Sequence, residues 1–180
     1  MEGFVTFDSE VSVIIARGID GSVKAYPPIT NRHRNHILDT SHVPSSLTAE
    51  QIKSAIAIAT KLSETLEYVG ILAVELFVKG DKLLFNEFAP RVHNSGHWSI
   101  EGAVTSQFEQ HIRAICGLPL GSTELLGRIE MTNLIGDEIN QLNALLAEPG
   151  VHLHLYGKSQ ARPNRKMGHI TRVFPETISQ

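Results

Sequence analysis

Strand-like and helix-like hydrophobic patterns alternate along this chain, and polar segments separate them. Runs rich in Val, Ile, Phe and Leu predict β-strands at residues 2–8, 10–17, 23–26, 70–78, 83–89, 128–135, 151–156 and 168–174. Apolar residues at helical spacing predict helices at residues 49–66, 106–115 and 137–147. The polar sequence of residues 29–47 predicts that this segment is a connection with extended character. The pattern therefore predicts an α+β fold.

The helix at 49–66 carries the clearest local signals. Thr48 and Gln51 have the spacing of a capping box. This helix and the one at 106–115 would cover an antiparallel sheet, and a small β-rich domain would follow. Because the connector at 118–127 contains Pro, Gly and Ser, we expect a boundary there, with domains at 1–117 and 118–180.

Two carboxylates, Glu75 and Glu87, lie inside apolar runs. A carboxylate that is buried alone is costly, so each must be paired, hydrogen-bonded, protonated or bound to a cation. Mg²⁺ is commonly held by one or two carboxylates together with nucleotide phosphates, and two glutamates on adjacent strands could supply that arrangement. The alternative is that each acid pairs with a nearby Arg or Lys.

The turn near Gly80-Asp81 decides whether these two acids can share an ion. A two-residue turn would place Glu75 opposite Asn86 and send Glu87 to the other face of the hairpin. A three-residue loop would place Glu75 directly opposite Glu87. A shared metal therefore predicts the three-residue loop.

A dense polar group that includes Arg91, His93 and Asn94 follows the second of these strands. Arginine binds planar anions and phosphates through paired hydrogen bonds, so the group is a candidate anion site. A solvated structural loop is the alternative. Zinc held by His93 and His97 is a weaker alternative, because the chain lacks cysteine pairs and the HExxH spacing.

A second basic group lies in segment 158–166, between Gly157 and Gly168. One interpretation is a solvated surface loop, and the sharper one is a clamp for a phosphate group. An RNA-binding patch is less favoured, because no aromatic residues alternate with the cations and the chain carries a formal charge of -3.

Composition narrows the class of protein further. With 42% hydrophobic and 19% charged residues, the chain is typical of soluble globular proteins. No apolar run approaches the ~18 residues of a membrane span. The single cysteine excludes an internal disulfide and fits a reducing cytoplasm.

Three stretches of the chain resemble one enzyme family. They are NEFAPRVHNSGHWSIEG at 86–102, HLHLYGKSQARPNRKMGHI at 152–170 and EVSVIIARGIDGSVKAYP at 10–27. The order of these stretches is similar to that in the 5-(carboxyamino)imidazole ribonucleotide synthetases. These are biotin-independent ATP-grasp ligases of purine biosynthesis, the ATPase subunit of phosphoribosylaminoimidazole carboxylase. The resemblance spans nearly all 180 residues.

This resemblance implies ATP-dependent carboxylation of 5-aminoimidazole ribonucleotide with bicarbonate, through carboxyphosphate. It implies that Mg²⁺ on the ATP phosphates is held by Glu75 and Glu87. Nucleotide contacts are implied for Glu2, Gly3, Phe4, Val5, Glu10, His33, Asn86 and Glu87. The catalytic group implied to face bicarbonate, carboxyphosphate and the imidazole comprises Arg91, His93 and Asn94. The phosphate of the ribonucleotide is expected at Lys158, Arg165 and Lys166.

The family's N-terminal nucleotide-fold domain and its glycine-rich lobe have no counterpart in these 180 residues. We therefore expect a C-terminal fragment that does not turn over alone. It is expected to be cytoplasmic and homodimeric, and to bind neither nucleic acid nor membranes. The alternatives are a non-catalytic nucleotide-binding or dimerisation module and, third, a zinc-dependent hydrolase.

Overall fold

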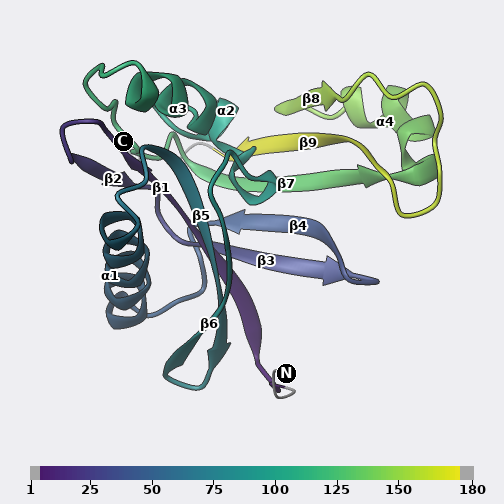
Figure 1. Ribbon diagram of the computed structural model, residues 1–180. Coiled ribbons are helices and arrows are strands. Elements are labelled where there is room, and N and C mark those ends of the chain that lie inside the picture. Colours follow the sequence, from purple (N-terminus) through teal and green to yellow (C-terminus); the bar gives the residue numbers. More distant parts are fainter. Residues whose placement is uncertain (1–4, 175–180) are drawn as a thin grey trace, which may run out of the picture.

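Residues 5–174 are described by the structure, a computed structural model, and their strands form one antiparallel sheet (Figure 1). The strand order is β6-β5-β1-β3-β4-β7-β9-β8, and β2 pairs with β1. The strands are β1 Ser9–Arg17, β2 Val23–Ala25, β3 Ile29–Arg34, β4 Ile37–Val43, β5 Gly70–Lys79, β6 Lys82–Ala89, β7 Arg128–Ile135, β8 Val151–Leu155 and β9 Lys166–Phe174. The α-helices are α1 Ala49–Thr65, α2 Ser99–Gly102, α3 Gln107–Ile115 and α4 Leu142–Leu146. None of the helices in the described range is long and apolar enough to cross a membrane.

Alternation along β1 and β5 divides the core between the two faces of the sheet. Val13 of β1 and Val74 of β5 belong to the cluster that packs against α1. Ile14 and Ala73 point to the opposite face, where the buried Trp98 completes a second cluster. Figure 1 shows α1 beside β1 and β6, well apart from α2 and α3.

The predicted capping box at the start of α1 is confirmed. The backbone N–H of Gln51 donates to Thr48 Oγ1 at 3.3 Å, and the backbone N–H of Thr48 donates to Gln51 Oε1 at 3.0 Å. Each side chain therefore satisfies one backbone donor that the helix leaves unpaired.

Thr48→Ala is expected to lower the free energy of unfolding by about 1 kcal/mol, because it removes the oxygen that accepts from the first turn. Urea denaturation followed by circular dichroism measures this change. Thr65→Ala, an exposed substitution at the other end of α1, is the control and should cause no comparable loss. Equal effects of both substitutions would contradict the assigned cap.

Residues 29–47 were predicted as an extended connection, and this prediction is wrong: they contain the β3–β4 hairpin. The turn residues Asn35 and His36 have φ angles of 51° and 62°. Both central residues of a type I′ turn need positive φ, and asparagine tolerates it better than most residues. The strand pattern was obscured because the hairpin tip is exposed and carries polar side chains on both faces.

Two other segments differ from the predicted strands and helices. Residues 5–8 are not a strand, and residues 2–4 of that predicted strand lie outside the described residues. The predicted helix at 137–147 is a 3₁₀-helix, Gly136–Gln141, followed by α4. The remaining predicted strands and helices are confirmed with small shifts at their ends.

Strand pairing between β4 and β7 joins the two predicted domains into a continuous sheet. The predicted boundary at 117/118 falls in the connector between α3 and β7. Arg34, at the end of β3, adds an ion pair with Glu138 from the C-terminal segment. The division into 1–117 and 118–180 stays a prediction, and the sheet passes through it.

Candidate active site

One face of the sheet changes from apolar to polar along β1 and β5. On β1 this face changes from the buried Ile14 to Ser12 and Glu10, and on β5 it changes from Ala73 to Glu75. Ser12 lies directly opposite Glu75 in the antiparallel pairing, so the polar ends of the two strands coincide. The alternation that builds the core therefore also gathers acidic side chains where the core ends.

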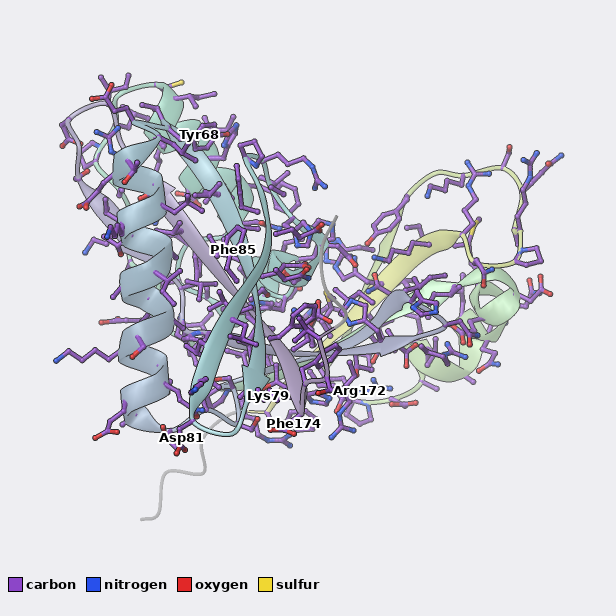
Figure 2. All side chains as sticks on the ribbon, turned by 60° about the horizontal axis from the view of Figure 1, so that its bottom comes forward. Tyr68, Lys79, Asp81, Phe85, Arg172 and Phe174 are labelled. Atoms are coloured by element: carbon purple, nitrogen blue, oxygen red, sulfur yellow. The ribbon has the colours of Figure 1, made fainter. Side chains whose placement is uncertain are left out.

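Glu75 and Glu87 are directly opposite each other, but the inference that this alignment requires a three-residue loop is wrong. Lys79 pairs with Lys82, so the turn has two residues, and Figure 2 marks it with Lys79 and Asp81. A register shift just beyond Leu76, which pairs with Phe85, restores the alignment of the two acids. The unpaired Asn86 is a β-bulge, a device that proteins use to re-aim side chains.

The bulge also changes which residues accompany Glu87. Simple alternation placed Leu83 and Phe85 on its face, whereas Leu83 packs in the α1 cluster and Phe85 pairs with Leu76, which faces α1. Asn86 and Glu87 both line the cleft that contains Glu75. Without the bulge, the two-residue turn would have sent Glu87 to the other face.

Three carboxyl groups crowd the polar end of this face. Burial, together with the charges of Glu10 and Glu87, raises the pKa of Glu75 to about 7. Burial also raises the pKa of Glu10, although a hydrogen bond with Glu75 opposes that shift. This concentration of negative charge is unfavourable without protons or a cation.

Two histidines border the acids. His33 Nδ1 lies 3.3 Å from Glu10 Oε2, and His93 Nε2 lies 3.6 Å from Glu75 Oε1. Burial, together with the nearby charge of Arg91, lowers the pKa of His93 to about 4. The contact of His93 with Glu75 therefore involves a neutral imidazole at neutral pH.

A pair of amides, the half-buried Asn94 and the buried Asn133, brings the C-terminal segment to the same place. Asn94 and Asn133 exchange two hydrogen bonds of 2.9 Å, and Lys166 Nζ donates to Asn94 Oδ1 at 2.7 Å. Burial lowers the pKa of Lys166, while the charge of Glu75 opposes that shift. The structure thus brings Lys166 together with the polar loop and the acids.

The acids open into a cleft of about 670 Å³, within the size range of small-molecule sites. Its lining includes Glu10, His33 and Asn86. A hollow of about 530 Å³ adjoins it and shares Glu10 and His33. Phe7 stacks on Phe77 at 4.3 Å between ring centroids and gives the cleft an apolar wall.

The other predicted residues lie at varying distances from this cleft. Lys158 Nζ donates to Lys166 O at 2.6 Å, which places it next to the site. Arg165 instead bonds to Gln160 O within its own loop, and Arg91 to Val92 O. Val5 is exposed. The predicted contacts at Glu2, Gly3 and Phe4 lie outside the described residues.

Sequence reasoning missed four buried polar residues that border the site: Ser12, Asn31, Ser41 and Asn133. Ser12 and Asn133 interrupt apolar runs, which is the signal that identified Glu75 and Glu87, whereas Asn31 and Ser41 lie in the segment predicted as a polar connection. The signal is weaker for small neutral side chains, because serine and asparagine are less costly to bury than a charge.

The donor set fits a hard divalent cation. Glu75 and Glu87 offer carboxylate oxygens from opposed strand positions, and burial together with the charges of Glu10 and Glu87 raises the pKa of Glu75. Within residues 5–174, no group of three or more His, Cys, Asp or Glu side chains is arranged to hold a metal ion. Two carboxylates completed by phosphate oxygens are a common arrangement for Mg²⁺.

Comparison with known proteins identifies relatives of the whole chain. The ATP-grasp domain family matches residues 1–108, and the phosphoribosylaminoimidazole carboxylase C-terminal domain family matches residues 130–178. N5-carboxyaminoimidazole ribonucleotide synthase from Brucella melitensis is 51% identical over 179 residues, which are 99% of this chain and 49% of the relative.

Solved structures show the same likeness. N5-carboxyaminoimidazole ribonucleotide synthetase from Thermus thermophilus matches with a TM-score of 0.90 at 51% identity, over 96% of this chain and 48% of that one. The Aspergillus clavatus enzyme, in complex with ADP and 5-aminoimidazole ribonucleotide, matches with a TM-score of 0.90 at 33% identity, over 96% and 48%. The chain spans about half the length of these relatives. It therefore belongs to the ATP-grasp family, in the branch whose relatives are N5-carboxyaminoimidazole ribonucleotide synthases.

Proposed function

We propose that this chain supplies one wall of the active site of an ATP-dependent carboxylase acting on 5-aminoimidazole ribonucleotide in purine biosynthesis. The observation that carries the proposal is that the opposed Glu75 and Glu87 line one cleft, while His93 contacts Glu75 and is followed by Asn94, which binds Lys166. Acids for a metal-bound nucleotide and cations for anionic substrates thus meet within one site.

The proposed reaction has two steps. Bicarbonate attacks the γ-phosphorus of ATP, which gives carboxyphosphate and ADP. The exocyclic amine of 5-aminoimidazole ribonucleotide then attacks the carboxyl carbon, and phosphate leaves as the carbamate forms. Bound Mg²⁺ would neutralise charge on the transferred phosphoryl group, and Glu75 and Glu87 would hold it.

The chain's own residues would position the substrates. Glu10 and His33 line both hollows and would contact the nucleotide. His93 and Asn94 would face the bicarbonate-derived anion. Lys166, with Lys158 beside it, would place positive charge near the phosphate of the ribonucleotide. Positioning and electrostatics would supply most of the rate.

We expect this chain alone not to turn over, because its residues form only one side of the cleft. Phosphoryl transfer depends on holding the reactants together and excluding water, and this chain corresponds to about half of its relatives. The cytoplasmic location and the homodimer implied by the resemblance stay predictions. Sedimentation velocity of the purified chain tests the dimer.

Titration of the purified chain with ATP, with and without Mg²⁺, tests the nucleotide site. We expect Mg²⁺-dependent binding that Glu87→Ala abolishes. A coupled assay for ADP release with bicarbonate and 5-aminoimidazole ribonucleotide should show no sustained turnover. ATP binding that does not depend on Mg²⁺, or that is unchanged by Glu87→Ala, would favour a non-catalytic module. Robust turnover by this chain would contradict the need for a second wall of the active site.

A further inference from the structure

A buried chain of hydrogen bonds crosses the sheet beneath the acids and ends on the imidazole of His93. Its members come from β4, β3, β1 and the loop after β6, and each is at most 4% exposed: Ser41, Asn31, Ser12 and Ser95. The links measure 2.8 Å from Ser41 to Asn31, 3.0 Å from Asn31 to Ser12 and 2.8 Å from Ser12 to Ser95. Ser95 Oγ then lies 2.9 Å from His93 Nδ1.

The amide of Asn31 gives this chain a direction. Its Oδ1 accepts from Ser41 Oγ, and its Nδ2 donates to Ser12 Oγ. Ser12 Oγ accepts from Asn31 and donates its single hydroxyl proton to Ser95 Oγ. The hydroxyl proton of Ser95 is then left for His93 Nδ1.

A second contact on His93 favours the same direction. The backbone N–H of Ser95 also points at His93 Nδ1, at 3.4 Å. A backbone N–H can only donate, so this longer contact adds a weaker preference for a lone pair on Nδ1. The ring proton of the neutral imidazole therefore lies on Nε2, the nitrogen 3.6 Å from Glu75 Oε1.

We propose that the buried chain Ser41–Asn31–Ser12–Ser95 holds His93 as the Nε2–H tautomer, so that His93 meets an anionic ligand in the cleft as a hydrogen-bond donor. The four residues are positioning residues, since they act through His93. An imidazole in this tautomer stabilises a bicarbonate or carboxyphosphate oxygen and does not take a proton at Nε2. That role rests on the proposed function, whereas the tautomer follows from the hydrogen bonds alone.

Asn31→Asp should reverse the direction of the buried hydrogen bonds without changing the number of heavy atoms in the side chain. A carboxylate only accepts, so the hydroxyl proton of Ser12 would turn to residue 31, and Ser12 Oγ would then accept from Ser95. Ser95 Oγ would be left to accept a proton from His93 Nδ1. We expect the ratio of Nε2–H to Nδ1–H tautomer to fall by about tenfold, since one hydrogen bond is exchanged for its reverse.

Long-range ¹⁵N–¹H NMR of the histidine rings measures the tautomer directly, in the purified chain without any ligand. The unsubstituted chain should show His93 protonated at Nε2, and Asn31→Asp should move the population toward Nδ1. Ser12→Ala, which cuts the chain, should give a mixture of tautomers. Ser63→Ala removes a buried serine of α1 that bonds to Thr60 O and should leave His93 unchanged.

Protonation at Nδ1 in the unsubstituted chain would overturn the proposal. So would an unchanged tautomer in both Asn31→Asp and Ser12→Ala, provided that the amide spectrum shows folded protein. If one variant does not fold, the other still decides the outcome. The measurement needs neither nucleotide nor substrate, so the tautomer of His93 can be established even if the proposed carboxylation is wrong. Likewise, a different tautomer would not contradict the proposed carboxylation.

Discussion

Glu75→Gln should weaken Mg²⁺-dependent binding of ATP by at least about tenfold, because it removes one of two opposed carboxylates that would hold the metal. The same substitution should stabilise the metal-free chain. Gln removes a charge that is buried beside Glu10 and Glu87, while it keeps the size and hydrogen-bonding capacity of the side chain. Opposite effects on binding and stability are typical of a site built for a cation.

The stability effect depends on pH in a definite direction. Glu75 ionises near its ordinary value of 4.5 in the unfolded chain and near a pKa of about 7 in the folded chain. Between these values the folded state holds more protons, so metal-free stability falls as pH rises through this window and levels off above it. We expect Glu75→Gln to remove most of this fall, a gain of about 2 kcal/mol at pH 8.

Two measurements check this prediction. Calorimetric titration with ATP, with and without Mg²⁺, measures binding, and urea denaturation in EDTA between pH 4.5 and 8 measures stability. Glu130→Gln is the control, since Glu130 lies on β7 next to His42 and Arg172, outside the cleft. A Glu75→Gln chain that binds MgATP normally would refute the metal site.

Asn133→Leu should lower the free energy of unfolding by about 3 kcal/mol, because it removes both hydrogen bonds to the Asn94 amide and the bond to the carbonyl of Leu38. Asn133 and Leu38 are both buried, so water cannot replace the bond to that carbonyl. The substitution should also weaken binding of 5-aminoimidazole ribonucleotide by about tenfold, since Lys166 loses its oriented acceptor on Asn94. Binding of ATP should change by less than about twofold, because Asn133 does not contact the carboxylates of β5 and β6.

Gln110→Leu is a matched control for Asn133→Leu. Gln110 is also fully buried and exchanges two hydrogen bonds with the backbone of Gly121, at 3.0 and 2.8 Å. It should cost comparable stability and leave both ligands unaffected. Equal losses of ligand binding in the two variants would show that Asn133 acts only on stability.

Local signals in the sequence predicted much of the fold. The cap of α1, the strand pairs β5–β6 and β1–β2, and helix α3 depend on residues close in the chain, so their patterns can be seen without the rest of the molecule. The β3–β4 hairpin was missed because its polar tip hides the alternation and its turn lacks glycine. Its strands are held by β1 and β7, which no local pattern reveals.

The residues of the candidate site also divide into those that local sequence signals identified and those that depend on contacts distant in sequence. Glu75 and Glu87 were identified because a charge inside an apolar run needs compensation. Their alignment was predicted for the wrong reason, because the sequence of the turn does not reveal the bulge at Asn86. The hydrogen bonds from Ser12 to Ser95 and from Asn94 to Asn133 join residues 83 and 39 positions apart.

By itself, the sequence determined which segments become strands and helices, where acidic and basic groups interrupt them, and which family the chain resembles. Only the tertiary structure decided that the acids share one face, that Lys166 reaches Asn94, and that a buried chain of polar side chains ends on His93. The physical reason is that side-chain periodicity depends on neighbours along the chain, whereas strand register and buried hydrogen bonds depend on partners that are distant in sequence.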